Sequence, residues 1–149
     1  MLEDIEESAK EELKRADHLI YVTLKYTRTA DVIKNTIKRL ISAFDFSIFD
    51  ALKYLKAKKK LKDIPSLPKL RAELLHKLRP DFRPDMCFYT LLKDINKAEY
   101  SKKEEYRKNV ALLAHLSAKE TVEVNVVKLM EFYRKTIEFV DKVIALPKK

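Results

Sequence analysis

The chain has 149 residues, of which 46% are hydrophobic and 37% are charged, and its formal net charge is +9. It contains no glycine, which excludes the phosphate-binding loops whose close backbone approach requires glycine. Its one cysteine, Cys87, cannot form an internal disulfide, which is typical of a cytoplasmic protein. Neither a signal peptide nor a membrane-length apolar run is recognisable, so we expect no membrane partner. By its length, the chain forms a single helical domain over residues 1–149.

A first helix is predicted over residues 3–26. Its apolar residues recur at helical spacing from Ile5 through Ala16 to Leu24. The segment that follows is short, and Thr29 is a favourable N-cap. We therefore expect the next helix to fold back against the first as an antiparallel hairpin.

Residues 30–57 are predicted to form the central helix of the molecule. Their first half has one apolar stripe, whereas their second half is apolar on nearly every side. A helix that is hydrophobic all round is buried, so the other elements are expected to surround it. Asp45 and Asp50 interrupt this apolar surface, and we interpret them as structural residues and not as a catalytic pair.

Two shorter helices are predicted next, over residues 68–78 and 84–97, separated by a proline-containing turn. Residues 101–126 have two interpretations. Ser101 and Glu104 form a capping box that favours a helix, whereas residues 121–126 alternate as a strand does. We expect a β-hairpin of residues 108–116 with 120–125, and then a last helix over 126–145 capped by Asn125. The predicted fold is mainly α, an antiparallel helical bundle with a small β-hairpin before the last helix.

Basic residues are concentrated between residues 56 and 83, a segment that contains ten lysines and arginines but only three acids. Such a patch is the electrostatic signature of a phosphate-rich partner such as RNA, although it is equally typical of a solvated helix end. Phe82, Phe88 and Tyr89 lie nearby in the sequence for base stacking. The residues predicted to bind a nucleic acid are Lys56, Lys58, Lys59, Lys60, Lys62, Lys69, Arg79 and Arg83.

The segment from Arg71 to His76, RAELLH, resembles the motif of arginine, four to six residues and histidine in the HEPN superfamily of small helical bundles. DINKAEYSKKEEY (94–106) and FYRKTIEFVDKVI (132–144) are similar to the later helices of that bundle. The resemblance implies a metal-independent ribonuclease that acts as a homodimer. His76 would move the proton of the 2′-hydroxyl, and Arg71 would stabilise the charge that develops on the phosphate.

Three further stretches resemble a group of small archaeal helical proteins. They are YTRTADVIKNTIKRLI (26–41), AEYSKKEEYRKNV (98–110) and VEVN (122–125). In that group the segment before VEVN is strand-like, which favours the hairpin. The polar turn over residues 26–29 is a second candidate surface if folding brings Tyr106 and Arg107 next to it, although its residues are also typical of a capped turn.

No metal or cofactor is expected, because the three histidines and Cys87 lack the spacing of a zinc site. Three functions therefore remain open: a non-enzymatic RNA-binding module, a ribonuclease that uses Arg71 and His76, and a homodimeric protein-interaction module.

Overall fold

The computed structural model describes residues 2–148, with side chains for residues 8–147. The first predicted helix is one continuous rod, made of α1 (Leu2–His18), a π-helical turn (Leu19–Thr23) and α2 (Leu24–Tyr26). Ala16 and Leu24, which belong to the predicted stripe, are buried. Ile5 belongs to the same stripe, but its side chain lies outside the described residues.

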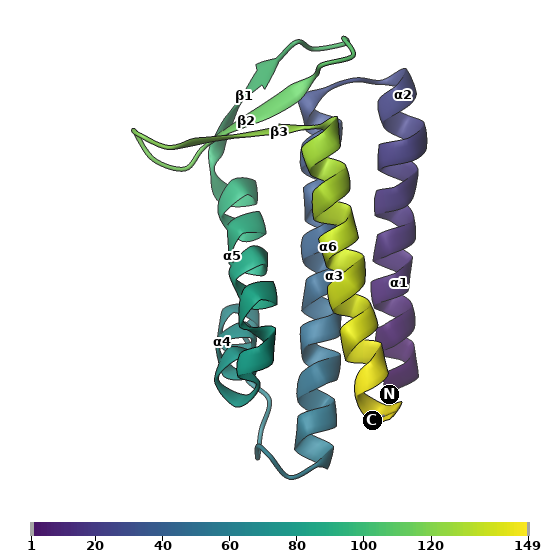
Figure 1. The fold of residues 1–149 in the computed structure, drawn as a ribbon, viewed down its shortest axis with the longest axis vertical. Helices are drawn as coiled ribbons and strands as arrows, with labels where there is room; N and C mark the ends of the chain where they lie inside the picture. Colours follow the sequence, from purple (N-terminus) through teal and green to yellow (C-terminus); the bar gives the residue numbers. More distant parts are fainter. Residues whose placement is uncertain (1, 149) are drawn as a thin grey trace.

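Helix α3 (Ala30–Ala57) is the unbroken central helix that the sequence predicts, with 28 residues and a length of about 42 Å. Its start is fixed as expected, since the Thr29 hydroxyl accepts a hydrogen bond of 3.3 Å from the Val32 N–H. Figure 1 shows α3 between α1 and α6 (Val126–Ala145) on one side and α4 (Pro68–Leu78) and α5 (Arg83–Lys97) on the other. Phe44 and Leu52, in its second half, are fully buried.

The core is held together by aromatic side chains that reach inward from three helices. Phe44 of α3 stacks on Phe139 of α6 (Val126–Ala145), with ring centroids 4.7 Å apart. Phe88 from α5 packs against Phe44 at 5.8 Å. Aromatic pairs of this kind stabilise a core beyond the area that they bury, so these contacts fix how α5 and α6 lie against α3.

Helices α4 (Pro68–Leu78) and α5 (Arg83–Lys97) form a helical hairpin, joined by a short turn at Pro80–Phe82. Both helices were predicted. Proline lies in the first turn of each, where its missing N–H has no helical partner to lose.

A three-stranded antiparallel sheet covers one end of the bundle (Figure 1). The predicted hairpin is confirmed as β2 (Ala111–His115) and β3 (Thr121–Asn125). The strand β1 (Glu99–Lys103) was not predicted, and the alternative interpretation of Ser101 and Glu104 as a capping box is wrong, because Ser101 pairs with Leu113 across the β1–β2 ladder. The fold is therefore mainly α, with a small sheet directly before the last helix.

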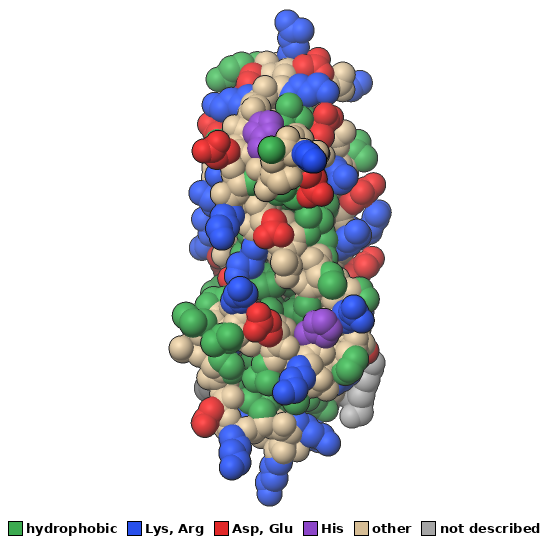
Figure 2. Space-filling view, turned by 90° about the vertical axis from the view of Figure 1, so that its left-hand side faces the viewer, with side chains coloured by type: hydrophobic (Ala, Val, Ile, Leu, Met, Phe, Trp, Pro, Cys, Tyr) green, Lys and Arg blue, Asp and Glu red, His purple; other side chains and the backbone are tan. Residues whose placement is uncertain are grey.

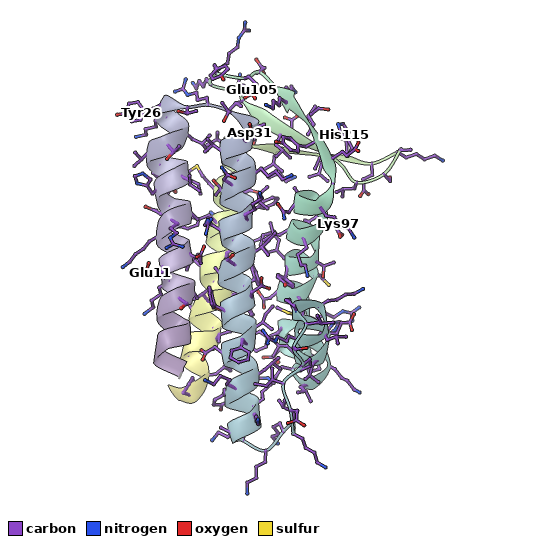
Figure 3. The ribbon with its side chains drawn as sticks, turned by 180° about the vertical axis from the view of Figure 1, so that it is seen from behind. Glu11, Tyr26, Asp31, Lys97, Glu105 and His115 are labelled. Atoms are coloured by element: carbon purple, nitrogen blue, oxygen red, sulfur yellow. The ribbon has the colours of Figure 1, made fainter. Side chains whose placement is uncertain are left out.

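The loop between β1 and β2 attaches the sheet to the start of α3. A carboxylate oxygen of Glu105 accepts a hydrogen bond of 3.0 Å from the Ala30 N–H, and the Tyr106 N–H donates to the Arg28 carbonyl at 2.6 Å. Figure 3 shows Glu105 beside Asp31 at this end of the molecule. The turn over residues 26–29 and Tyr106, far apart in the sequence, are thus adjacent.

Candidate nucleic-acid interface

The lysine end of the molecule is the C-terminal end of α3 together with the loop after it, and it consists of Lys56, Lys58, Lys59, Lys60 and Lys62. All five side chains are exposed. Figure 2 shows basic side chains projecting from the foot of the molecule, where this loop lies in Figure 1. The end of the long central helix therefore presents several positive charges to solvent.

A Schellman motif ends α3 and fixes the backbone of this loop. The Lys60 N–H donates to the Leu55 carbonyl at 2.9 Å, and the Lys59 N–H donates to the Lys56 carbonyl at 3.0 Å. Lys59 takes a left-handed conformation with φ of 61°. Glycine usually occupies this position of the motif, and in a chain without glycine a lysine occupies it at a steric cost.

A groove of about 640 Å³ runs beside the lysine end. Lys58 and Lys60 line one side of it, and Leu78 and Arg79 from the end of α4 line the other. Tyr54 also lines the groove, with the Lys58 ammonium 5.8 Å from the centre of its ring. The groove therefore combines positive charge with one aromatic ring, as surfaces that bind single-stranded nucleic acids do.

The lysines of this end differ from the neighbouring arginine in their ion pairs. None of the five forms an ion pair within the part of the chain that the structure describes. Arg79 instead holds Asp81 with two hydrogen bonds of 2.8 and 2.9 Å. This bidentate contact lowers the pKa of Asp81 below its ordinary value and raises the pKa of Arg79, so the charge of Arg79 is already compensated.

The structure divides the predicted basic patch. Lys69 lies on α4 and lines a separate cavity between α4 and α5. Arg83 is exposed at the first position of α5. Charges that are contiguous in the sequence over residues 56–83 therefore belong to different surfaces, and the lysine end is the part that the fold keeps together.

Arg71 and His76, which the resemblance pairs, have different surroundings. Arg71 donates to the Pro65 carbonyl at 2.6 Å, and its guanidinium lies 4.7 Å from the centre of the Phe49 ring. His76 is half-buried and lines the cavity between α4 and α5, whereas Arg71 does not. Five residues apart on one helix, the two side chains leave it about 140° apart.

The aromatic residues expected to stack on bases lie elsewhere. Phe82 and Tyr89 are 2% and 1% exposed, and Phe88 is packed against Phe44 and Phe132. These rings belong to the core because α5, for Phe88 and Tyr89, and the turn before it, for Phe82, direct them toward α3 and α6. Tyr54 is the ring that borders the lysine end, and its position one turn before the lysines was the available sequence signal.

Asp45 is a half-buried carboxylate on α3, and it has a structural partner. The Tyr89 hydroxyl donates a hydrogen bond to it. Burial raises the pKa of Asp45 above its ordinary value, while the bond from Tyr89 and the charges of Lys93 and Arg71 act in the opposite direction. This contact agrees with the interpretation of Asp45 as a structural residue that links α3 to α5.

Within the described residues, no group of three or more histidine, cysteine or acidic side chains could hold a metal ion. None of the helices in that part of the chain combines the length and apolar character that crossing a membrane requires. Comparisons of the chain with known protein families, with curated proteins and with solved structures found no match.

Proposed function

We propose that this protein binds single-stranded RNA through the lysine end and the groove beside it, without cleaving it. The observation that carries the proposal is that five exposed lysines surround one end of α3, and that within the described residues none of them is paired with an acid. Lysines that replace condensed counterions on phosphates gain affinity from counterion release. The affinity of the protein for RNA would therefore fall as the salt concentration rises.

The groove adds a contact that does not depend on charge. Tyr54 is half-buried and lines the groove together with Leu55 and Lys58. A base placed against this ring would gain stacking energy, which contributes about 1–3 kcal/mol per base in other single-strand complexes. This preference for an unstacked base favours single strands over duplexes.

Binding without cleavage is favoured over the ribonuclease alternative because of the position of Arg71. Its side chain is held by the Pro65 carbonyl and the Phe49 ring, on a different side of α4 from His76. A ribonuclease would need both groups at one phosphate. We therefore expect RNA to remain intact when it is incubated with the protein.

Fluorescence anisotropy with a labelled single-stranded RNA of twelve uridines, over a range of salt concentrations, tests the proposal. The variant K58A/K60A/K62A should make the negative slope of log K against log salt shallower by about 2, since each phosphate contact contributes about −0.7 for single strands. The matched control K108A/K119A/K128A removes the same charge from exposed lysines at the sheet end, and it should leave most of the affinity.

Two results would contradict the proposal. One is equal loss of affinity in the two triple variants, which would indicate attraction by net charge alone. The other is absence of salt-dependent binding in the natural sequence. Gel analysis of the same samples examines cleavage, and products that form with the natural sequence but not with His76→Ala would favour the ribonuclease.

A further inference from the structure

A second hollow lies away from the lysine end, between α4 and α5 with α3 behind it. Its volume is about 530 Å³, within the range of roughly 300–1,000 Å³ found for small-molecule sites. Figure 2 shows the face that α4 and α5 form, where hydrophobic side chains are visible between charged ones. The cavity is thus large enough for a ligand of one or two rings.

The inner wall of this cavity is apolar. It is formed by Ile41 of α3, Ala72 of α4, and Met86 and Tyr89 of α5. Tyr89 is buried in this wall, with its hydroxyl engaged by Asp45, so it supports the wall and Met86 is the residue that can contact a ring system. A thioether in the wall favours an aromatic ligand over an aliphatic one, because sulfur makes specific contacts with ring edges.

The rim of the cavity is positive at one end. Lys69 lies in the first turn of α4, and Lys93 and Lys97 lie in the second half of α5. The short turn at Pro80–Phe82 makes α4 and α5 run in opposite directions, so Lys69 and Lys93 are at similar distances along the two helices from that turn, and Lys97 lies one helical turn further along α5.

Within the described part of the chain, none of the three ammonium groups forms an ion pair. Lys93 is positioned by the ring of Tyr89, with its ammonium 5.1 Å from the ring centre. Asp94 is the acid nearest to them in the sequence, and Glu73 follows one turn further along α4. The three lysines and two acids that line the cavity therefore leave an excess of one positive charge beside the apolar wall.

We propose that this cavity is a binding site for an aromatic organic anion, with its ring against Ile41 and Met86 and its acidic group between Lys69 and Lys93. A carboxylate, sulfonate or phosphate ester on a ring system satisfies this chemistry. The site is separate from the groove at the lysine end, so the two can be tested independently.

Cys87 is a built-in reporter for this site. It is the only cysteine of the chain, it is exposed, and it lines the cavity. The rate at which iodoacetamide, a neutral reagent, alkylates Cys87 reports occupancy of the cavity. A bound ligand should slow this reaction in proportion to the fraction of protein occupied.

The probe for the test is 8-anilinonaphthalene-1-sulfonate, an aromatic sulfonate whose fluorescence rises in apolar surroundings. It should bind the folded protein and slow alkylation of Cys87. Lys69→Glu should weaken binding by about tenfold or more, since a contact to a charged group contributes at least that factor. The matched control Lys128→Glu, on α6, should leave the Kd of the probe unchanged.

Two comparisons complete the test. Ala72→Phe should abolish binding by filling the cavity, with circular dichroism as the check on folding. N-phenyl-1-naphthylamine, a neutral ring system, and decanoate, an aliphatic anion, should protect Cys87 less than the sulfonate does. Equal binding by Lys69→Glu and Lys128→Glu, equal protection by the neutral compound, or probe binding without protection of Cys87 would each overturn the proposal.

Discussion

The two ends of α3 use charge in opposite ways. At its first residues, the acids have hydrogen-bond or charge partners: Glu105 accepts from the Ala30 N–H, Tyr100 donates to Asp31, and the Lys102 ammonium lies 3.5 Å from Asp31. At its last residues the lysines have no acidic partner in the described structure. Matched charges hold elements together, whereas unmatched charges remain available for a ligand. This difference, and not the number of charges, separates a structural end from a candidate binding end.

The largest effect on stability is expected from the buried contact between α3 and α5. Tyr89→Phe leaves the half-buried Asp45 without the donor that approaches it, and an unsatisfied buried group costs about 1–3 kcal/mol. Chemical denaturation measures this loss in the free energy of unfolding.

The matched control removes the same type of bond at the surface. Tyr100→Phe breaks the hydrogen bond to Asp31, whose side chain is 56% exposed, so we expect a change within about 0.5 kcal/mol. Equal effects of the two substitutions would contradict the view that burial decides the value of these bonds.

A smaller loss in the free energy of unfolding is expected from Glu105→Ala at the sheet end. This change removes the acceptor of the Ala30 N–H at the first position of α3, while the Thr29 cap remains, at a cost of about 1–2 kcal/mol. Glu123→Ala is the control, because it breaks only an exposed pair with Lys103, and such pairs contribute less than about 1 kcal/mol. Unchanged unfolding in Glu105→Ala would mean that the loop does not anchor the sheet.

Lys59→Gly should stabilise the protein by about 0.5–1 kcal/mol. Lys59 has a φ of 61°, a conformation that costs a residue with a Cβ atom but not glycine. Lys58→Gly, at the preceding position with a φ of −86°, should give no such gain. Thermal unfolding distinguishes the two variants, and a destabilised Lys59→Gly would contradict the assignment of the Schellman motif.

The smallest expected effect is the response of the sheet end to acid. The hydrogen bond from Tyr100, and then the charge of Lys102, lower the pKa of Asp31 below 3.8. Because the folded-state pKa is depressed, this contribution to stability is present above pH 3.8 and is lost as the pH falls through the lowered value. NMR titration of the Asp31 carboxyl should give a pKa below the ordinary value, and this pKa should rise in Tyr100→Phe. An unchanged pKa in that variant would show that the hydrogen bond from Tyr100 does not lower it.

Local signals in the sequence were sufficient for most of the helices. Thr29 and Asn125 cap α3 and α6 as predicted, with Asn125 accepting a hydrogen bond of 2.8 Å from the Lys128 N–H. Capping and apolar spacing act over a few residues, so a single sequence displays them. The long apolar stretch likewise indicated that α3 would be central.

Strand β1 could not be predicted in this way because its partners are distant. Ser101 and Glu104 have the spacing of a capping box, but Ser101 pairs with Leu113, and Glu104 adopts a φ of 50° in the loop that reaches α3. Pairing and anchoring of this kind depend on residues that approach only in the fold.

The candidate site could be predicted only in part, because it too depends on residues that approach one another only in the fold. The sequence indicated the lysines, but it did not show that Asp81 compensates Arg79 or that Phe82 is buried. Which charges are matched and which rings remain accessible is decided by tertiary packing, and this explains why the predicted basic patch is reduced to the lysine end.

The most direct test of the difference between the two ends is an NMR titration of the isotopically labelled protein with the single-stranded RNA. We predict chemical-shift changes at Tyr54, at residues 56–62 and at Leu78, with little change at residues 99–106. Changes centred on the sheet end, or spread evenly over all exposed lysines, would contradict the claim that the unmatched lysines after α3 form the binding surface.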